Sequence, residues 1–279
     1  MNAIARALLA KLPEPVDPDV VTPAEEAELA IRLFRSPIRH ARPEREAALL
    51  ASATRDTIDG GVARQSWGEP NAPTTLLVHG WEGRGAQLGA FVAPLMSAGR
   101  RVVMFDGPAH GDSPGQQTNI VEFARAIAGV TAPAAQPDSV IAHSFGGPAT
   151  AFAIAREGLR PKRLVLMSGP DSLEGVLRRF RDFLGISPEA FELFRAGVRS
   201  IGGITDDDFR ISDVLRELGA PTLVIHAPED EEVPIAEAEA MVANCPNAIL
   251  LRADGCNHRK VLYAPEIVAA ATDFLTRSA

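Results

Sequence analysis

Hydrophobic positions beyond residue 60 fall into two alternating kinds of segment. Short β-like runs, most of them continuously apolar, are separated by longer stretches with a helical pattern. Continuous apolar runs are typical of strands buried on both faces of a parallel sheet. The runs predict strands at 61–68, 74–80, 101–107, 139–144, 163–169, 222–227 and 248–253.

Helical segments fill the intervals between these predicted strands. They are expected at 86–98, 118–131, 146–158, 234–243 and 264–277. A regular alternation of strands and helices predicts a doubly wound α/β sheet. The chain of 279 residues suits one globular domain with a large core.

Two regions depart from the alternation. Residues 1–57 are rich in Ala, Glu and Arg, and their clearest helix follows Thr22, with Pro23 at its first position. Between Gly169 and Pro221 the pattern shows helical pieces and no strand, and a structureless loop of that length is improbable in a compact domain.

These departures predict three parts. They are an N-terminal helical extension (1–57), an α/β core (58–169 and 221–279) and a small helical cap inserted at 170–220. The alternative for the cap is a set of extra packing helices with no role in access to a site. The sequence does not decide whether the N-terminal helices support a homo-oligomer or cover the sheet.

Charge and cysteine content narrow the classes of partner and cofactor. The net charge is -8 and no basic cluster stands out, so we expect neither nucleic acid nor an anionic membrane as the main partner. No apolar run is long enough to cross a bilayer, and we find no signal peptide. Cys245 and Cys256 form no CxxC pair, which argues against zinc ribbons and disulfide frameworks. We expect a cytoplasmic protein without a metal or organic cofactor.

The stretch SVIAHSFGGPATAF, residues 139–152, places a serine where an apolar run meets a helix start. Ser144 has small residues two positions away on either side, Ala142 and Gly146. A sharp strand-to-helix turn that exposes a nucleophilic serine needs this lack of bulk, usually as G-x-S-x-G. The helix that follows favours developing negative charge at its N-terminus.

A serine nucleophile needs a base, and the base needs an orienting acid. Asp230 follows the predicted strand 222–227, and His258 lies in the loop after the last predicted strand. The order Ser, Asp, His is the one expected for this architecture. The backbone N–H of Phe145 and that of Trp81, in the glycine-rich loop after strand 74–80, are the candidate oxyanion donors.

The motifs together resemble the α/β-hydrolase superfamily. They are HGW (79–81), DGPAHGDSPG (106–115), AHSFGG (142–147), HAPEDEEVP (226–234) and GCNH (255–258). The resemblance spans residues 60–279 and implies an eight-stranded, mostly parallel sheet. It also implies a Ser144–His258–Asp230 triad with an oxyanion hole at Trp81 and Phe145. The family commonly has G-x-D before V-P, where this chain has PED.

Rival roles exist for several of these side chains. Asp171, Glu229 and Glu231 are alternative acids, of which Asp171 occupies a position that some family members use. His143, beside the serine, is expected to face away from it along the strand and to pack or form a hydrogen bond.

The remaining candidates are expected to be structural. His79 and His110 fix loops, Asp106 organises the 106–115 turn, and Cys256 is a small packing residue. For the phenylalanines of the cap, a pocket lining and a plain core are equally favoured; they are Phe180, Phe183, Phe191 and Phe194.

The sequence thus predicts a serine hydrolase, first of all a carboxylic ester hydrolase that acts through an acyl-enzyme on a small-molecule substrate. Amide, thioester, lactone or carbon–carbon bond cleavage stays open. Two other classes are a ligand-binding or receptor protein that retains the fold and an acyltransferase. The fold alone names no substrate.

Overall fold

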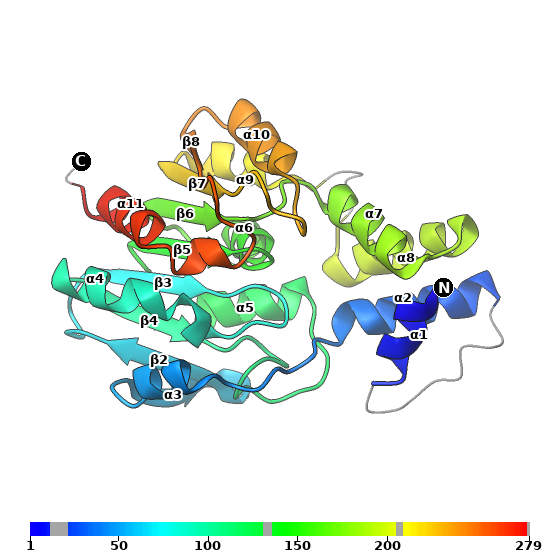
Figure 1. The fold of residues 1–279 in the computed structure, drawn as a ribbon, viewed down its shortest axis with the longest axis horizontal. Coiled ribbons are helices and arrows are strands. Elements are labelled where there is room, and N and C mark those ends of the chain that lie inside the picture. Colours follow the sequence, from blue (N-terminus) through cyan, green and yellow to red (C-terminus); the bar gives the residue numbers. More distant parts are fainter. Residues whose placement is uncertain (12–21, 131–135, 205–208, 278–279) are drawn as a thin grey trace.

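The computed structural model describes residues 1–11, 22–130, 136–204 and 209–277, and its strands form one eight-stranded sheet (Figure 1). The strands are β1 (Thr54–Ile58), β2 (Val62–Trp67), β3 (Thr74–Val78), β4 (Arg101–Phe105), β5 (Ser139–His143), β6 (Arg163–Met167), β7 (Thr222–His226) and β8 (Ala248–Arg252). Their order is β1-β2-β4-β3-β5-β6-β7-β8. β2 pairs antiparallel with β1 and β4, and all pairs from β4 to β8 are parallel. The predicted mostly parallel sheet is confirmed.

Helices cover both faces of this sheet. The α-helices are α1 (Ala3–Leu9), α2 (Pro23–Arg35), α3 (Glu44–Leu50), α4 (Val92–Ser97), α5 (Ile120–Val130), α6 (Gly146–Arg156), α7 (Leu173–Leu184), α8 (Pro188–Gly202), α9 (Ile211–Leu218), α10 (Ile235–Asn244) and α11 (Pro265–Thr276). One apolar cluster joins the sheet to α5, α6, α9 and α10, and another joins the opposite face to α4 and α11. Both faces are therefore buried, as a doubly wound sheet requires.

Central strands are buried along their whole length. Every residue of β5 and of β7 is buried, which explains their continuous apolar sequence. Parallel pairing of β3, β5, β6 and β7 brings the carboxyl ends of these strands to one edge of the sheet. Ligands of open α/β sheets bind outside this edge.

Two elements differ from expectation. β1 lies within the region expected to be helical, and four of its five residues are exposed, so it is an edge strand with no apolar run to reveal it. The helix expected at 86–98 begins instead with a 3-10 segment at Gly85–Phe91. A Cβ on Gly89 would lie 2.4 Å from Leu49 Cδ2, so this segment packs too closely against α3 for a larger residue.

The helices outside the sheet layers form a separate cluster. α1 and α2 pack against α7 and α8 through shared apolar residues, and Figure 1 shows the four helices together at one end of the molecule. α9, which belongs to the same predicted cap segment, packs instead on α6 and α10. Residues 205–208 of that segment lie outside the described residues.

Phenylalanines hold this four-helix cluster together. Phe34 of α2 meets Phe180 and Phe194 edge-on at ring distances of 5.0 and 5.5 Å. Phe191 and Phe194 are buried there, whereas Phe183 is exposed. The core interpretation of the buried rings is thus the one that the structure supports. Among the described helices, none combines the length and apolar character needed to span a bilayer.

Candidate active site

Ser144 occupies a strained turn between β5 and α6. Its φ is +51°, in the left-handed region that costs an L-residue about 1–2 kcal/mol. The turn is held by the Ser144 N–H, which donates to Met167 O at 2.8 Å, and by the Gly147 N–H, which donates to Ser144 O at 2.9 Å. Strain of this kind persists only where the surrounding structure enforces it.

Small residues around Ser144 are required by close contacts. A Cβ on Gly146 would lie 2.7 Å from Val78 O, and a Cβ on Gly80 would lie 2.9 Å from Ser144 Cβ. Ala142, where the usual motif has glycine, is fully buried in β5 and fits there with its methyl group. The A-x-S-x-G form therefore keeps the tight turn.

His258 and Asp230 are joined by a buried hydrogen bond. His258 Nδ1 donates to Asp230 Oδ2 at 2.8 Å, and the two side chains are 7% and 0% exposed. The other oxygen of Asp230 accepts the backbone N–H groups of Glu232 and Val233, both at 2.9 Å. Burial alone would raise the pKa of Asp230, but the hydrogen bonds from His258 and Val233 lower this pKa to about 2. Asp230 is thus a fixed anion that orients the imidazole.

The rival acids lie elsewhere. Asp171 is buried but accepts the Ser212 N–H at 2.8 Å and the Ser212 hydroxyl at 3.1 Å, which places it at the start of α9. Burial raises the pKa of Asp171. Glu229 and Glu231 are exposed at the surface.

Ser144 and His258 line one cavity of about 710 Å³. Among the hydrogen bonds of the described residues, none joins the Ser144 hydroxyl to His258. His258 Nε2, the nitrogen left free by the Asp230 contact, lies 3.6 Å from Glu232 Oε2. Glu232 also lies 3.3 Å from Arg259, which lines the cavity as well.

His143 supports the histidine loop. Its Nε2 donates to the backbone carbonyl of His258 at 2.8 Å, and the two rings pack 4.8 Å apart. Burial lowers the pKa of His143 to about 3, so this imidazole stays neutral. Sequence reasoning expected a hydrogen bond or packing here, and the structure contains both.

Two backbone N–H groups flank the nucleophile. Phe145 follows Ser144 directly and precedes α6, and Trp81 lies in the loop after β3. Neither backbone N–H has an acceptor among the described residues. The Trp81 ring packs 5.2 Å from the Phe145 ring. A Cβ on Gly80, the residue before Trp81, would lie 2.9 Å from Ser144 Cβ, so the loop after β3 runs beside the nucleophile. The N-terminus of α6 favours developing negative charge beside Ser144.

Two buried histidines fix the surrounding loops, as expected. His79 Nε2 accepts the Gly107 N–H at 2.8 Å, and His110 Nε2 accepts the Glu82 N–H at 3.1 Å. Burial lowers the pKa of His79 to about 4 and that of His110 to about 3. Both rings therefore stay neutral and keep the lone pair that accepts each hydrogen bond.

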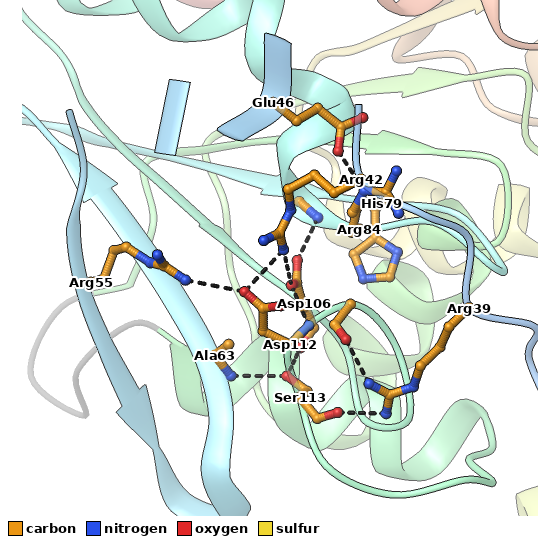
Figure 2. Close-up of polar contacts among 12 residues, drawn as sticks. Arg39, Arg42, Glu46, Arg55, Ala63, His79, Arg84, Asp106, Asp112 and Ser113 are labelled. Atoms are coloured by element: carbon orange, nitrogen blue, oxygen red, sulfur yellow. Dashed lines mark hydrogen bonds and ion pairs between the residues drawn. The ribbon is translucent and has the colours of Figure 1, made fainter. Parts of the chain in front are cut away.

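Asp106 organises the turn that begins with it. One carboxylate oxygen accepts the Asp112 N–H at 2.8 Å, and the other accepts the Gly85 N–H at 2.9 Å (Figure 2). Burial raises the pKa of Asp106. This side chain thereby ties the 106–115 turn to the end of the loop that carries Trp81.

The cavity wall contains a segment that sequence reasoning missed. His40, Pro43, Arg45, Glu46 and Leu49 line the cavity, although they come from the N-terminal extension. None of the described lining residues comes from α7 or α8. The N-terminal sequence gives no signal of this role, because the contacts that bring it to the site are long-range.

Other candidate chemistry is sparse among the described residues. No group of three or more His, Cys, Asp or Glu side chains is arranged to hold a metal ion in the part of the chain that the structure describes. Cys256 is buried within the apolar cluster beneath α11, which fits a packing residue.

Comparisons with known proteins agree with this geometry. Residues 75–271 match the family described as "Alpha/beta hydrolase family". The chain is 25% identical over 255 residues to pimeloyl-[acyl-carrier protein] methyl ester esterase of Aromatoleum aromaticum, covering 74% of this chain and 99% of that protein.

Two solved structures show the same fold. A bacterial membrane phospholipase A, described as a virulence factor, has a TM-score of 0.62 at 21% identity, over 84% of this chain and 89% of that one. A bromoperoxidase from Bacillus anthracis has a TM-score of 0.61 at 19% identity, over 80% and 100% of the two chains.

Proposed function

Because the chain belongs to the alpha/beta hydrolase family, we propose that it is a serine hydrolase that cleaves carboxylic esters of small or medium acyl groups. The observation that carries this proposal is the buried hydrogen bond between His258 and Asp230, on a loop that lines the same cavity as the strained Ser144. A ligand-binding protein has no need of an ionised, buried acid held against a histidine.

The reaction would proceed through an acyl-enzyme. Ser144 Oγ attacks the acyl carbon while His258 Nε2 takes the hydroxyl proton, and Asp230 stabilises the imidazolium that forms. His258 then gives this proton to the leaving alcohol as the ester C–O bond breaks. Water, deprotonated by His258, attacks the acyl-enzyme, and the proton returns to Ser144 Oγ as the acid leaves.

The oxyanion of each tetrahedral intermediate would be held by the N–H groups of Trp81 and Phe145. Donors of this kind are worth on the order of 100- to 1000-fold in kcat each. Their lack of intramolecular acceptors among the described residues supports this role, since a donor already bonded inside the protein would have to be released first.

The substrate class follows from the cavity and the relative. A cavity of about 710 Å³ is of a size that encloses a small molecule. The curated relative is named as a methyl ester esterase, which favours an ester with a small alcohol. The cytoplasmic location, the homo-oligomer and the division into extension, core and cap stay predictions.

Turnover of p-nitrophenyl acetate and butyrate tests the proposal. We expect a burst of nitrophenolate stoichiometric with enzyme, absent in Ser144→Ala and in His258→Gln. Thr150→Ser, which is buried in α6 and does not line the cavity, serves as the matched control and is expected to keep the burst. Activity on thioesters or amides with none on these esters would replace the ester assignment, and saturable binding without turnover would favour a receptor.

A further inference from the structure

A buried ion pair joins the N-terminal extension to the loop beside the nucleophile. Arg84 lies against Glu46 of α3, with side chains only 6% and 5% exposed (Figure 2). The remaining nitrogens of the guanidinium donate to His40 O at 2.8 Å and to Ala41 O at 3.0 Å. All three guanidinium nitrogens thus bind residues 40–46. A buried pair of this kind is weak evidence for a net gain in stability, whereas its geometry fixes one segment against the other.

Glu82 makes a second connection between the same parts. One of its carboxylate oxygens accepts the Ile38 N–H at 3.2 Å, and the other lies 3.3 Å from His40 Nε2. Glu82 has a φ of +56°, which is unfavourable for a side chain of this size. Its backbone N–H donates to His110. The left-handed conformation of Glu82 is therefore held by its side-chain contacts with residues 38 and 40 and by its backbone hydrogen bond to His110.

Two arginines of the same N-terminal segment, Arg39 and Arg42, attach it to the 106–115 turn. Arg39 donates to the carbonyl groups of Gly111, Ser113 and Gly115. Arg42 lies 2.9 Å from Asp112 (Figure 2). We call residues 38–46 the clamp segment and residues 79–84 the oxyanion loop. The clamp segment is attached to the core at several points.

Trp81 lies in the middle of the oxyanion loop, next to Glu82. The loop closes through the Gly83 N–H, which donates to Gly80 O at 3.0 Å. Glu82 and Arg84 follow Trp81 closely in the chain, so their attachment to residues 38–46 holds the end of this short turn. Oxyanion donors act only when they point at the position of the developing charge, so a small displacement is costly.

We propose that the clamp segment is a component of the active site, with Glu46 and Arg84 as positioning residues for the Trp81 N–H. The inference rests on the proposed function, because it assigns the clamp to oxyanion stabilisation. It extends the active site to residues that precede the family match at 75–271. Arg84 acts through the loop backbone and takes no part in proton transfer.

Glu46→Gln and Arg84→Lys test the clamp. We expect kcat for p-nitrophenyl butyrate to fall about 10- to 100-fold with KM within threefold of the native value. The inhibition constant of phenylboronic acid, whose adduct with serine mimics the tetrahedral anion, is expected to rise in parallel. Glu46→Asp, which keeps the carboxylate, is expected to recover part of kcat.

Glu237→Gln is the matched control, since it removes the ion pair with Arg179 that joins α7 to α10 outside the cavity lining. It is expected to lower thermal stability and leave kcat unchanged. Glu82→Gln removes a partly exposed carboxylate and serves if Glu46→Gln does not fold. Folded variants with native kcat and native inhibition constant would overturn the clamp proposal and leave the proposed serine hydrolase function intact. A native enzyme without turnover or burst would overturn the proposed function and the clamp with it.

Discussion

His258 Nδ1 and Asp230 Oδ2 lie 2.8 Å apart, and the carboxylate that accepts this hydrogen bond is completely buried. The contact fixes which nitrogen carries the proton, so Nε2 is left to accept one. The same carboxylate accepts two backbone N–H groups from its own loop. The orientation of His258 is thus fixed by Asp230, a carboxylate that is itself held by its own loop.

Asp230→Asn should therefore lower kcat by about 10,000-fold, because the amide favours the wrong tautomer of His258. The acid limb of the native pH–rate profile should not report Asp230, whose pKa is about 2. Steady-state kinetics between pH 5 and 9 check both points. A variant with kcat within tenfold of native would show that another group orients the histidine.

Gly80→Ala should disable the enzyme without unfolding it. The new Cβ would lie 2.9 Å from Ser144 Cβ and 3.3 Å from His143 O, so the nucleophile and the oxyanion loop must move apart. Misplacement on the scale of 1 Å lowers kcat by about 100-fold. Gly147→Ala is the matched control, because its Cβ would meet nothing within 4 Å. Gly147→Ala should keep native kcat. Equal activity in Gly80→Ala and Gly147→Ala would contradict the close contact between Gly80 and Ser144.

Acid should destabilise the fold through its buried histidines. Burial lowers the pKa of His143 to about 3, so the unfolded chain binds a proton below pH 6.5 that the folded chain does not. Stability from this group is complete above pH 6.5 and is lost as the pH falls from there toward 3. At pH 5 the loss for one such group is about 2 kcal/mol.

Urea unfolding of the native protein and of His143→Gln at pH 7.5 and pH 5 isolates this contribution. The variant should lose about 2 kcal/mol less than the native protein between the two pH values. Asp106 and Asp171 have raised pKa values and therefore add stability as the pH falls, opposite to His143. Their contributions are the same in the native protein and in the variant, so the comparison of the two proteins cancels them. Identical losses of stability in the native protein and in His143→Gln would show that His143 has the same protonation in the folded and the unfolded state.

Glu232 should select against anionic leaving groups. Its carboxylate lies 3.6 Å from His258 Nε2, the atom that gives its proton to the departing alcohol. Two like charges about 4 Å apart in water repel by roughly 1 kcal/mol, or about fivefold in kcat/KM. Glu232→Gln should therefore raise kcat/KM for a carboxylate-bearing phenyl ester about fivefold relative to a neutral one.

Glu231→Gln provides the control for that selectivity, since Glu231 is exposed on the same loop and, among the described residues, forms no ion pair with His258. It should leave the ratio of the two esters unchanged. An unchanged ratio in Glu232→Gln would mean that Arg259, 3.3 Å from Glu232, already neutralises the carboxylate.

The buried half of the fold could be read from the sequence, because burial on two faces leaves a continuous apolar pattern. β5 and β7 have that pattern at every position; Ser144 follows β5 directly, and Asp230 lies in the loop after β7. His258 lies in the loop after β8, an edge strand whose sequence is apolar although it is only partly buried. β1 escaped notice because an exposed edge strand such as TRDTI carries no apolar run.

Long-range polar contacts left no trace in the local pattern. The attachment of Glu46 to Arg84 joins residues 38 positions apart, and neither side chain alone indicates a partner. The association of α1 and α2 with α7 and α8 is likewise a matter of which apolar faces meet, which periodicity does not specify.

Mass-spectrometric mapping of the residue labelled by a fluorophosphonate tests the central claim most directly, because it needs no knowledge of the substrate. We predict a single modified residue, Ser144, with labelling strongly slowed in His258→Gln. Labelling of another residue, or none in the folded native protein, would contradict the assignment of Ser144 as an activated nucleophile.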